Sequence, residues 1–139
     1  MFILENLHDI NNIYSKILRK VGNSNNLTFE QIKLLFAIPY DGILLSELAF
    51  VLGIDNSTLT RNLQKLEKNN FLVISTTNFD KRKKTLFLSD KGQKKIHHIE
   101  NSILSVFKKL NKHLSIDDIQ EIQNSLEKLN WAFNCFNNE

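Results

Sequence analysis

The chain has 139 residues, 42% of them hydrophobic, which fits one domain or one domain with added dimerisation helices, and four Gly with one Pro favour a mainly helical fold. Its net charge of +3 is unevenly placed: residues 55–95 carry 10 Lys and Arg against 4 Asp and Glu (+6) and the rest carries 8 against 11 (−3), a separation typical of nucleic-acid binders. No apolar run reaches the roughly 18 residues that span a membrane, and the N-terminus lacks the features of a signal peptide, so we expect a cytoplasmic protein with no membrane partner.

The first predicted helix spans about residues 3–21. Its apolar stripe is too wide for a lone surface helix and needs a covering surface, either from the domain or from a second subunit. The Gly-, Ser- and Asn-rich residues 22–26 predict a loop. The stripe consists of Leu7, Ile10, Ile13, Tyr14, Ile17, Leu18 and Val21.

The second helix is predicted to begin after Thr28, a favourable N-cap residue. Gln31 stands three residues later and completes the pattern of a capping box. The helix should end near Pro39, because the proline ring disfavours helical geometry in the residue before it. Residues 41–42 then predict a turn, and residues 43–45 predict a short extended segment.

Two short helices joined by a tight turn are predicted next. The first covers residues 47–52 and is followed by Gly53, the residue type that best tolerates the left-handed backbone just past a helix. Asp55 stands at the N-cap position of the second, whose buried stripe is Leu59, Leu63 and Leu66. Its other face offers groups that can donate hydrogen bonds to phosphates and base edges in a major groove: Asn56, Ser57, Thr58, Arg61, Asn62, Lys65 and Lys68.

A β-hairpin is predicted after this helix pair. Residues 71–77 and 83–88 are rich in β-forming side chains, and the polar residues 78–82 lie between them. Four adjacent cations at the tip repel one another unless a polyanion or solvent is near. They are Lys81, Arg82, Lys83 and Lys84.

Two further helices complete the chain. Ser89 can cap a long helix that runs to about Lys112, with apolar residues at three- and four-residue spacing. Ser115 can cap the last helix, whose first turn carries acidic residues that the helix dipole favours. The apolar faces of the terminal helices suggest that these helices pack together.

Three segments in this order resemble the winged helix-turn-helix core of the MarR family of bacterial transcriptional regulators: LTFEQIKLLFAI, SELAFVLGIDNSTLTRNLQKLEKNNFLV and DKRKKTLFLSDKG. The resemblance implies an α+β fold, mainly α with a small β-hairpin, in which residues 43–45 often add a third strand. It implies a DNA-binding region at residues 27–95 and dimerisation helices at residues 1–22 and 96–139. The implied partners are double-stranded DNA and a second copy of the chain.

The residues expected to bind DNA fall into two groups. On the recognition helix they are Asn56, Ser57, Thr58, Thr60, Arg61, Asn62 and Lys65; Arg61 suits a guanine edge or a phosphate, and Thr60 and Lys65 suit the backbone. On the wing they are Asp80, Lys81, Arg82, Lys83 and Lys84. The family's Asp-x-Arg pair is present as Asp80 and Arg82, and the resemblance implies that the aspartate orients an arginine that enters the minor groove. The wing lysines would contact phosphates.

The chain departs from the family pattern at three places. Ser75 or a neighbour stands where members often have an arginine before the wing turn, which weakens one expected phosphate contact. Asn70-Phe71 stands where many members have Gly-Leu, and Leu44 stands where Thr or Ser often caps the first helix of the pair. We interpret the last two as local substitutions that the fold can absorb.

Enzyme and metal-site interpretations find little support in the sequence. It has no HExxH, CxxC or glycine-rich phosphate-binding motif. His97 and His98 are adjacent, so they point about 100° apart on a helix and cannot share a metal without outside ligands. The single cysteine, Cys135, has no flanking basic residue, which favours a structural thiol over a redox switch. We therefore expect no enzymatic activity, no metal and no cofactor.

Two classes of function follow from these patterns. The first is a dimeric DNA-binding regulator, a repressor by family precedent, that reads a pseudo-palindromic operator. The resemblance leaves open both a small-molecule effector that relieves repression and a member without one. The second class is a protein–protein adaptor built on a winged helix, or a ligand-independent architectural DNA binder. The charge separation and the Asp80-x-Arg82 pair favour the first.

Overall fold

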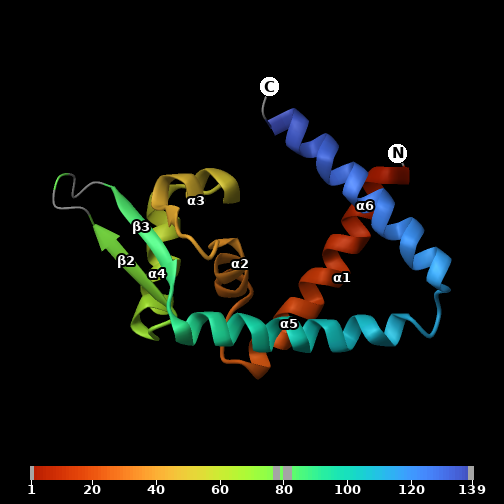
Figure 1. Cartoon of the computed structure of the whole chain (residues 1–139), viewed down its shortest axis with the longest axis horizontal. Helices are drawn as coiled ribbons and strands as arrows, with labels where there is room; N and C mark the ends of the chain where they lie inside the picture. The colour runs from red at the N-terminus through yellow and green to blue at the C-terminus, as the bar shows by residue number, and fades with distance from the viewer. Residues whose placement is uncertain (1, 77–78, 80–82, 138–139) are drawn as a thin grey trace. The chain divides into compact units, whose positions relative to one another are not determined.

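A computed structural model describes residues 2–76, 79 and 83–137. The chain divides into two compact units, residues 1–103 and residues 104–139. Figure 1 shows the mainly helical chain and its small sheet. In order, the elements are α1 (Phe2–Ser24), α2 (Phe29–Ala37), β1 (Ile43–Leu44), α3 (Leu45–Leu52), α4 (Asn56–Lys68), β2 (Leu72–Thr76), β3 (Lys84–Leu88), α5 (Asp90–Leu110) and α6 (Ile116–Asn137).

The core of the first unit is almost entirely aliphatic. Helices α1 to α5 and strands β2 and β3 each contribute buried side chains, and α4 contributes the predicted Leu59, Leu63 and Leu66, each at most 1% exposed. Burial of three leucines on one face fixes which side of α4 remains available to a partner.

The element order, mainly helices with one small sheet, confirms the fold class predicted from the sequence.

The sheet is antiparallel, with strand order β1-β3-β2. Strand β3 pairs with β2 along its whole length, from Leu72 opposite Leu88 to Thr76 opposite Lys84. The short β1 pairs with the other edge of β3, so the extended segment before the helix pair does add a third strand. Gly42, just before β1, has φ +88°, and a Cβ there would lie 2.5 Å from the Phe87 ring.

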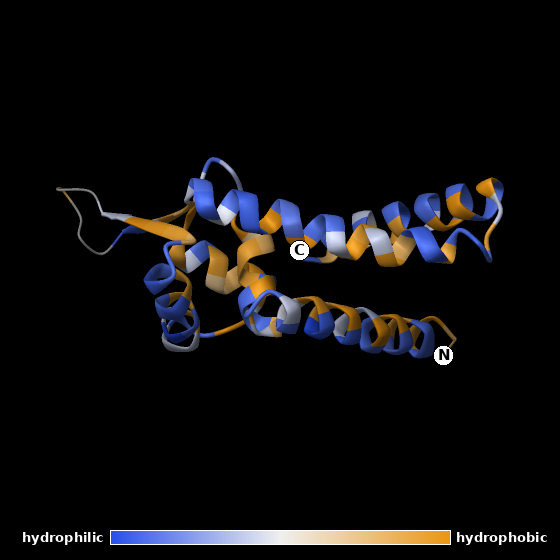
Figure 2. Ribbon diagram, turned by 90° about the horizontal axis from the view of Figure 1, so that it is seen from below, coloured by the Kyte–Doolittle hydropathy of each residue, from blue (hydrophilic) through white to orange (hydrophobic). Residues whose placement is uncertain are grey.

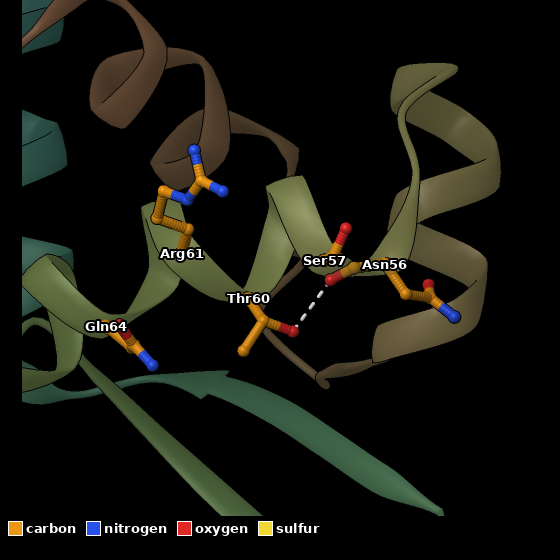
Figure 3. A pocket seen from close by; sticks show the side chains of 5 residues that line it. All are labelled: Asn56, Ser57, Thr60, Arg61 and Gln64. Carbon is orange, nitrogen blue, oxygen red and sulfur yellow. Dashed lines mark hydrogen bonds between the residues drawn. The ribbon is translucent and has the colours of Figure 1, made fainter.

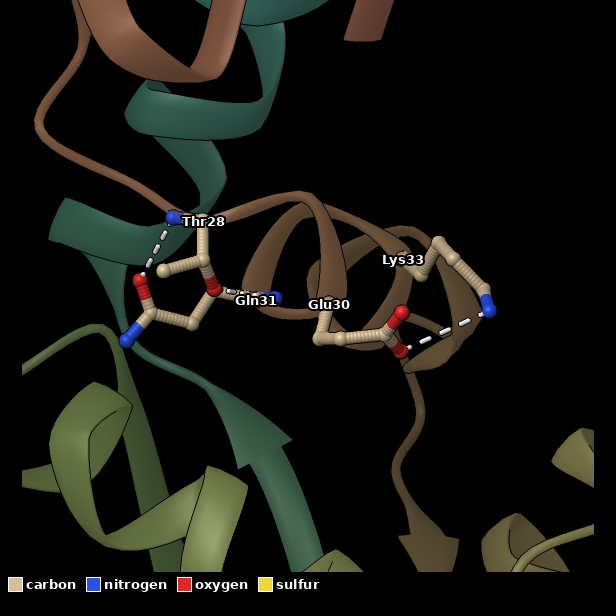
Figure 4. Close-up of polar contacts among 4 residues, drawn as sticks. All are labelled: Thr28, Glu30, Gln31 and Lys33. Atoms are coloured by element: carbon tan, nitrogen blue, oxygen red, sulfur yellow. Dashed lines mark hydrogen bonds and ion pairs between the residues drawn. The ribbon is translucent and has the colours of Figure 1, made fainter. Parts of the chain in front are cut away.

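The caps predicted from the sequence are present at four helices. Thr28 and Gln31 form a reciprocal capping box at α2, where Glu30 also pairs with Lys33 at 3.5 Å (Figure 4). Ser89 accepts the Gly92 N–H at α5, and Ser115 and Asp118 bond reciprocally at α6. The cap of α4 belongs to the candidate site.

Two predicted boundaries were wrong. Helix α1 continues through residues 22–24, because Asn25 and Leu27 N–H groups bond the Gly22 carbonyl and the Asn25 side chain bonds the Val21 carbonyl. Helix α3 begins at Leu45 rather than Glu47, so only residues 43–44 are extended. Leu44 occupies the N-cap without a side-chain hydrogen bond, consistent with the expected loss of a Thr or Ser cap.

The long helices carry apolar residues that the single chain leaves exposed. Figure 2 shows hydrophobic residues interspersed with hydrophilic ones along the long helices. No helix in the described part of the chain is both long and apolar enough to cross a membrane. On α1 the exposed residues include Phe2, Ile3, Leu4, Ile10 and Ile13; on α5, Leu104, Phe107 and Leu110; on α6, Ile116, Ile122, Leu126, Trp131, Phe133 and Phe136.

Candidate nucleic-acid interface

The start of α4 is fixed by its two flanking residues. Gly53 adopts the left-handed conformation (φ 63°) that ends α3, and the N–H of Ile54 bonds back to the Ala49 carbonyl. Asp55 then caps α4: its carboxylate accepts hydrogen bonds from the Ser57 hydroxyl and from the hydroxyl and N–H of Thr58, the latter two at 2.7 and 2.8 Å. The Ser57 hydroxyl, followed by the two Thr58 donors, holds the pKa of the Asp55 carboxyl well below its usual value.

The face of α4 opposite the leucines lines a shallow surface depression. Figure 3 shows its five residues: Asn56, Ser57, Thr60, Arg61 and Gln64. The Thr60 hydroxyl donates to the Asn56 carbonyl at 2.7 Å, which holds the threonine side chain against its own helix. No hydrogen bond or ion pair to another described residue engages Arg61 or Gln64, so both side chains can turn toward an incoming ligand.

The predicted recognition-helix residues do not all share this face. Thr58 is exposed but its hydroxyl donates to the Asp55 cap, and Lys65 is exposed beside the depression rather than in it. Asn62 is half-buried on the flank of the leucine stripe. DNA contacts for all the predicted recognition-helix residues remain predictions.

Gln64 was not among the residues predicted to bind DNA. It follows Ser57, Thr60 and Arg61 at helical spacing, which places the four on one exposed face. A glutamine amide can pair with both adenine N6 and N7. The three- and four-residue spacing was the signal that could have identified it.

The described part of the wing carries two exposed cations, one of which lies beside α4. Lys83 and Lys84 are exposed, and Lys84 begins β3 opposite Thr76. A small hollow of about 160 Å³ separates α4 from the sheet, lined on the helix side by Thr60 and Gln64 among others and on the sheet side by Ile74 and Lys84. Lys84 therefore lies near the Thr60 and Gln64 side of α4. The predicted contacts Asp80, Lys81 and Arg82 lie outside the described residues.

The turn after α4 explains one departure from the family pattern. Asn70 has φ +59°, the left-handed conformation that glycine adopts most easily and that asparagine tolerates better than other side chains. Asparagine can therefore stand where relatives have glycine.

No group of three or more potential metal ligands is present within the part of the chain that the structure describes.

Two helices joined by a tight left-handed turn, followed by a hairpin in a three-stranded sheet, define a winged helix-turn-helix protein. A sequence model of the MarR family matches residues 10–84. The chain belongs to the MarR family of transcriptional regulators.

The relatives support this assignment. The chain is 21% identical to the HTH-type transcriptional regulator TcaR of Staphylococcus aureus, covering 99% of this chain and 92% of TcaR. It resembles the crystal structure of a MarR transcriptional regulator from Methanosarcina mazei, with a TM-score of 0.83, 23% identity and coverage of 97% and 98% of the two chains. It also resembles a mutant MarR from E. coli complexed with operator DNA, with a TM-score of 0.73, 23% identity and coverage of 93% and 94%.

Proposed function

We propose that this protein is a sequence-specific, double-stranded-DNA-binding regulator that acts as a homodimer on a pseudo-palindromic operator. The observation that carries this proposal is the exposed face of α4, where Arg61 and Gln64 have no partner among the described residues. Arginine reads guanine O6 and N7, and glutamine reads adenine N6 and N7, in a major groove that admits a helix. The similar E. coli protein was crystallised with operator DNA, which supports the same use of this fold.

The wing would supply the second part of the interface. Exposed Lys83 and Lys84 can neutralise phosphates, and Lys84 lines the hollow beside α4. The sequence places Arg82 next to them, two residues after Asp80. A narrow, AT-rich minor groove concentrates negative potential and attracts arginine, so we propose minor-groove binding for Arg82.

Homodimerisation is proposed on the basis of the exposed apolar helix faces. Side chains such as Ile13 on α1, Phe107 on α5 and Phe133 on α6 are 42–61% exposed in the single chain. Exposed apolar helix faces of this kind mark interaction sites. A two-fold pair of chains would present two recognition helices about one DNA turn (~34 Å) apart, which matches a pseudo-palindrome.

We further propose that the regulator is a cytoplasmic repressor. A small-molecule effector would relieve repression by favouring a spacing of recognition helices that does not fit the operator. The effector has to bind that state more tightly than the DNA-bound one. Family membership is the support for this part of the proposal.

The test is binding of the purified chain to a fragment of its own promoter and to random duplex, across about 50–300 mM salt. We expect specific binding that falls steeply with salt and that Arg61→Ala and Arg82→Ala weaken. Lys112→Ala, which removes one cation from the exposed turn between α5 and α6, is the charge control and should bind normally. No binding at low salt would refute the regulator and favour the adaptor, whereas equal weak binding to both duplexes would favour an architectural role.

A further inference from the structure

The turn that ends the recognition helix is tied to the first turn of α5. The Ser89 hydroxyl donates to the Asn70 carbonyl at 2.6 Å, and the Ser89 N–H donates to the Phe71 carbonyl at 3.1 Å. The same hydroxyl accepts the N–H of Gly92 at 3.0 Å, so it caps α5 while it holds the end of α4. One side chain thus joins the start of α5 to the turn after α4, across 19 residues of sequence.

Lys91 makes a second connection at this junction. Its ammonium donates to the Asn69 carbonyl at 2.8 Å and lies 4.9 Å from the centroid of the Phe71 ring. Asn69 is the C-cap residue of α4, so the cation stands at the end of the helix where the carbonyl groups give a negative potential. Both interactions are stronger for a cation than for a neutral donor.

Gly92 allows the two segments to approach this closely. A Cβ at this position would lie 1.9 Å from the carbonyl oxygen of Phe71, so any larger residue would push α5 away from the turn. The two backbones are therefore in direct contact. The Ser89 and Lys91 side chains stabilise this contact through their hydrogen bonds to the Asn70 and Asn69 carbonyls.

Directional bonds matter here because the rest of the α4 attachment is apolar. Three leucines hold α4 against the core and fix which face it exposes. Apolar contacts have no preferred direction, however, so they resist small shifts along the helix less than hydrogen bonds do. Hydrogen bonds to the Asn69 and Asn70 carbonyls depend on distance and angle. They therefore fix where the C-terminal end of α4 stands.

We propose that Ser89 and Lys91 are positioning residues for DNA binding: they hold the C-terminal end of the recognition helix to α5, so that the direction of α5 sets how α4 meets the operator. This inference rests on the proposed DNA-binding function. Lys91 acts through the Asn69 carbonyl and the Phe71 ring and not through a phosphate. Loss of either residue therefore lowers specific binding more than non-specific binding.

The experiment compares variants of the full chain on the promoter fragment and on random duplex at one salt concentration. Lys91→Met keeps a chain of similar length over Phe71 but removes the ammonium, and Lys94→Met removes one charge from the next turn of α5 as the matched control. We expect Lys91→Met and Ser89→Ala to lower specific affinity by about threefold to tenfold, and Lys94→Met to act equally and weakly on both duplexes. The conservative variants Lys91→Arg and Ser89→Thr should retain the specific affinity of the wild-type chain.

Two results would contradict this inference in different ways. If Lys91→Met only matches Lys94→Met on both duplexes, Lys91 contributes charge alone and the inference is wrong. If wild-type chain binds neither duplex, both the proposed function and this inference are overturned. Ser89→Ala also removes the α5 cap and should lower the melting temperature, so Lys91→Met, an exposed substitution, decides the case if Ser89→Ala unfolds.

Discussion

Replacement of Gly92 by alanine should destabilise the protein, although the same change in a helix interior usually stabilises it by about 0.8–1 kcal/mol. At Gly92 the added Cβ would lie 1.9 Å from the Phe71 carbonyl oxygen. The closest ordinary carbon–oxygen contacts are about 3.3 Å, so backbone has to shift, and overpacking costs about 1–3 kcal/mol. A Cβ this close places the cost at the upper end of that range, so after the gain in helix propensity the net expectation is a loss of about 2 kcal/mol.

Thermal unfolding followed by circular dichroism at one protein concentration measures this loss. For a chain of this size, it corresponds to a melting temperature lower by about 3–8 °C. Asn101→Ala, at an exposed position on the same helix, is the control: it gains helix propensity without a clash and should keep or raise the melting temperature. An equal or higher melting temperature for Gly92→Ala would show that the contact is not tight.

Three further predictions concern other parts of the molecule. Gly42→Ala should lower the melting temperature through a cost of about 1–2 kcal/mol, because φ is +88° and the Cβ would meet the Phe87 ring; an unchanged melt would contradict it. The pKa values of Asp55 and Asp118 are lowered from 3.8, mainly by hydroxyl donors, so their stabilising contribution is full above about pH 4 and is lost as the pH falls through the lowered values. Melting temperatures from pH 5 to pH 2 should therefore fall less in Asp118→Asn than in wild type, and parallel curves would exclude this origin. Gln64→Ala should weaken promoter binding about tenfold and leave random-duplex binding unchanged; equal losses on both would make Gln64 a non-specific contact.

Local signals in the sequence predicted most helix starts correctly. Thr28, Asp55, Ser89 and Ser115 cap the helices at which they were expected, because a cap joins residues only two or three positions apart. Gly53 ends its helix for the same local reason. Such contacts can be read without knowledge of the fold.

Features that depend on distant residues were not predictable in this way. The Lys91 ammonium meets a carbonyl 22 residues earlier in the chain, and nothing near Lys91 in the sequence marks that contact. Helix α3 starts at Leu45 without a side-chain cap, so its beginning carries no cap signal. Gly22 stands inside α1, where composition had predicted a loop, because the turn after the helix folds back onto its carbonyl.

The distribution of aromatic residues determines what optical spectroscopy of this protein will report. Among the aromatic side chains that the structure describes, Phe71 alone belongs to the buried core, and the single tryptophan, Trp131, is 70% exposed on α6. Tryptophan emission will therefore follow the surroundings of α6 and be nearly silent to melting of the aliphatic core. A blue shift on raising the protein concentration, with far-ultraviolet dichroism unchanged, would record chains pairing rather than folding.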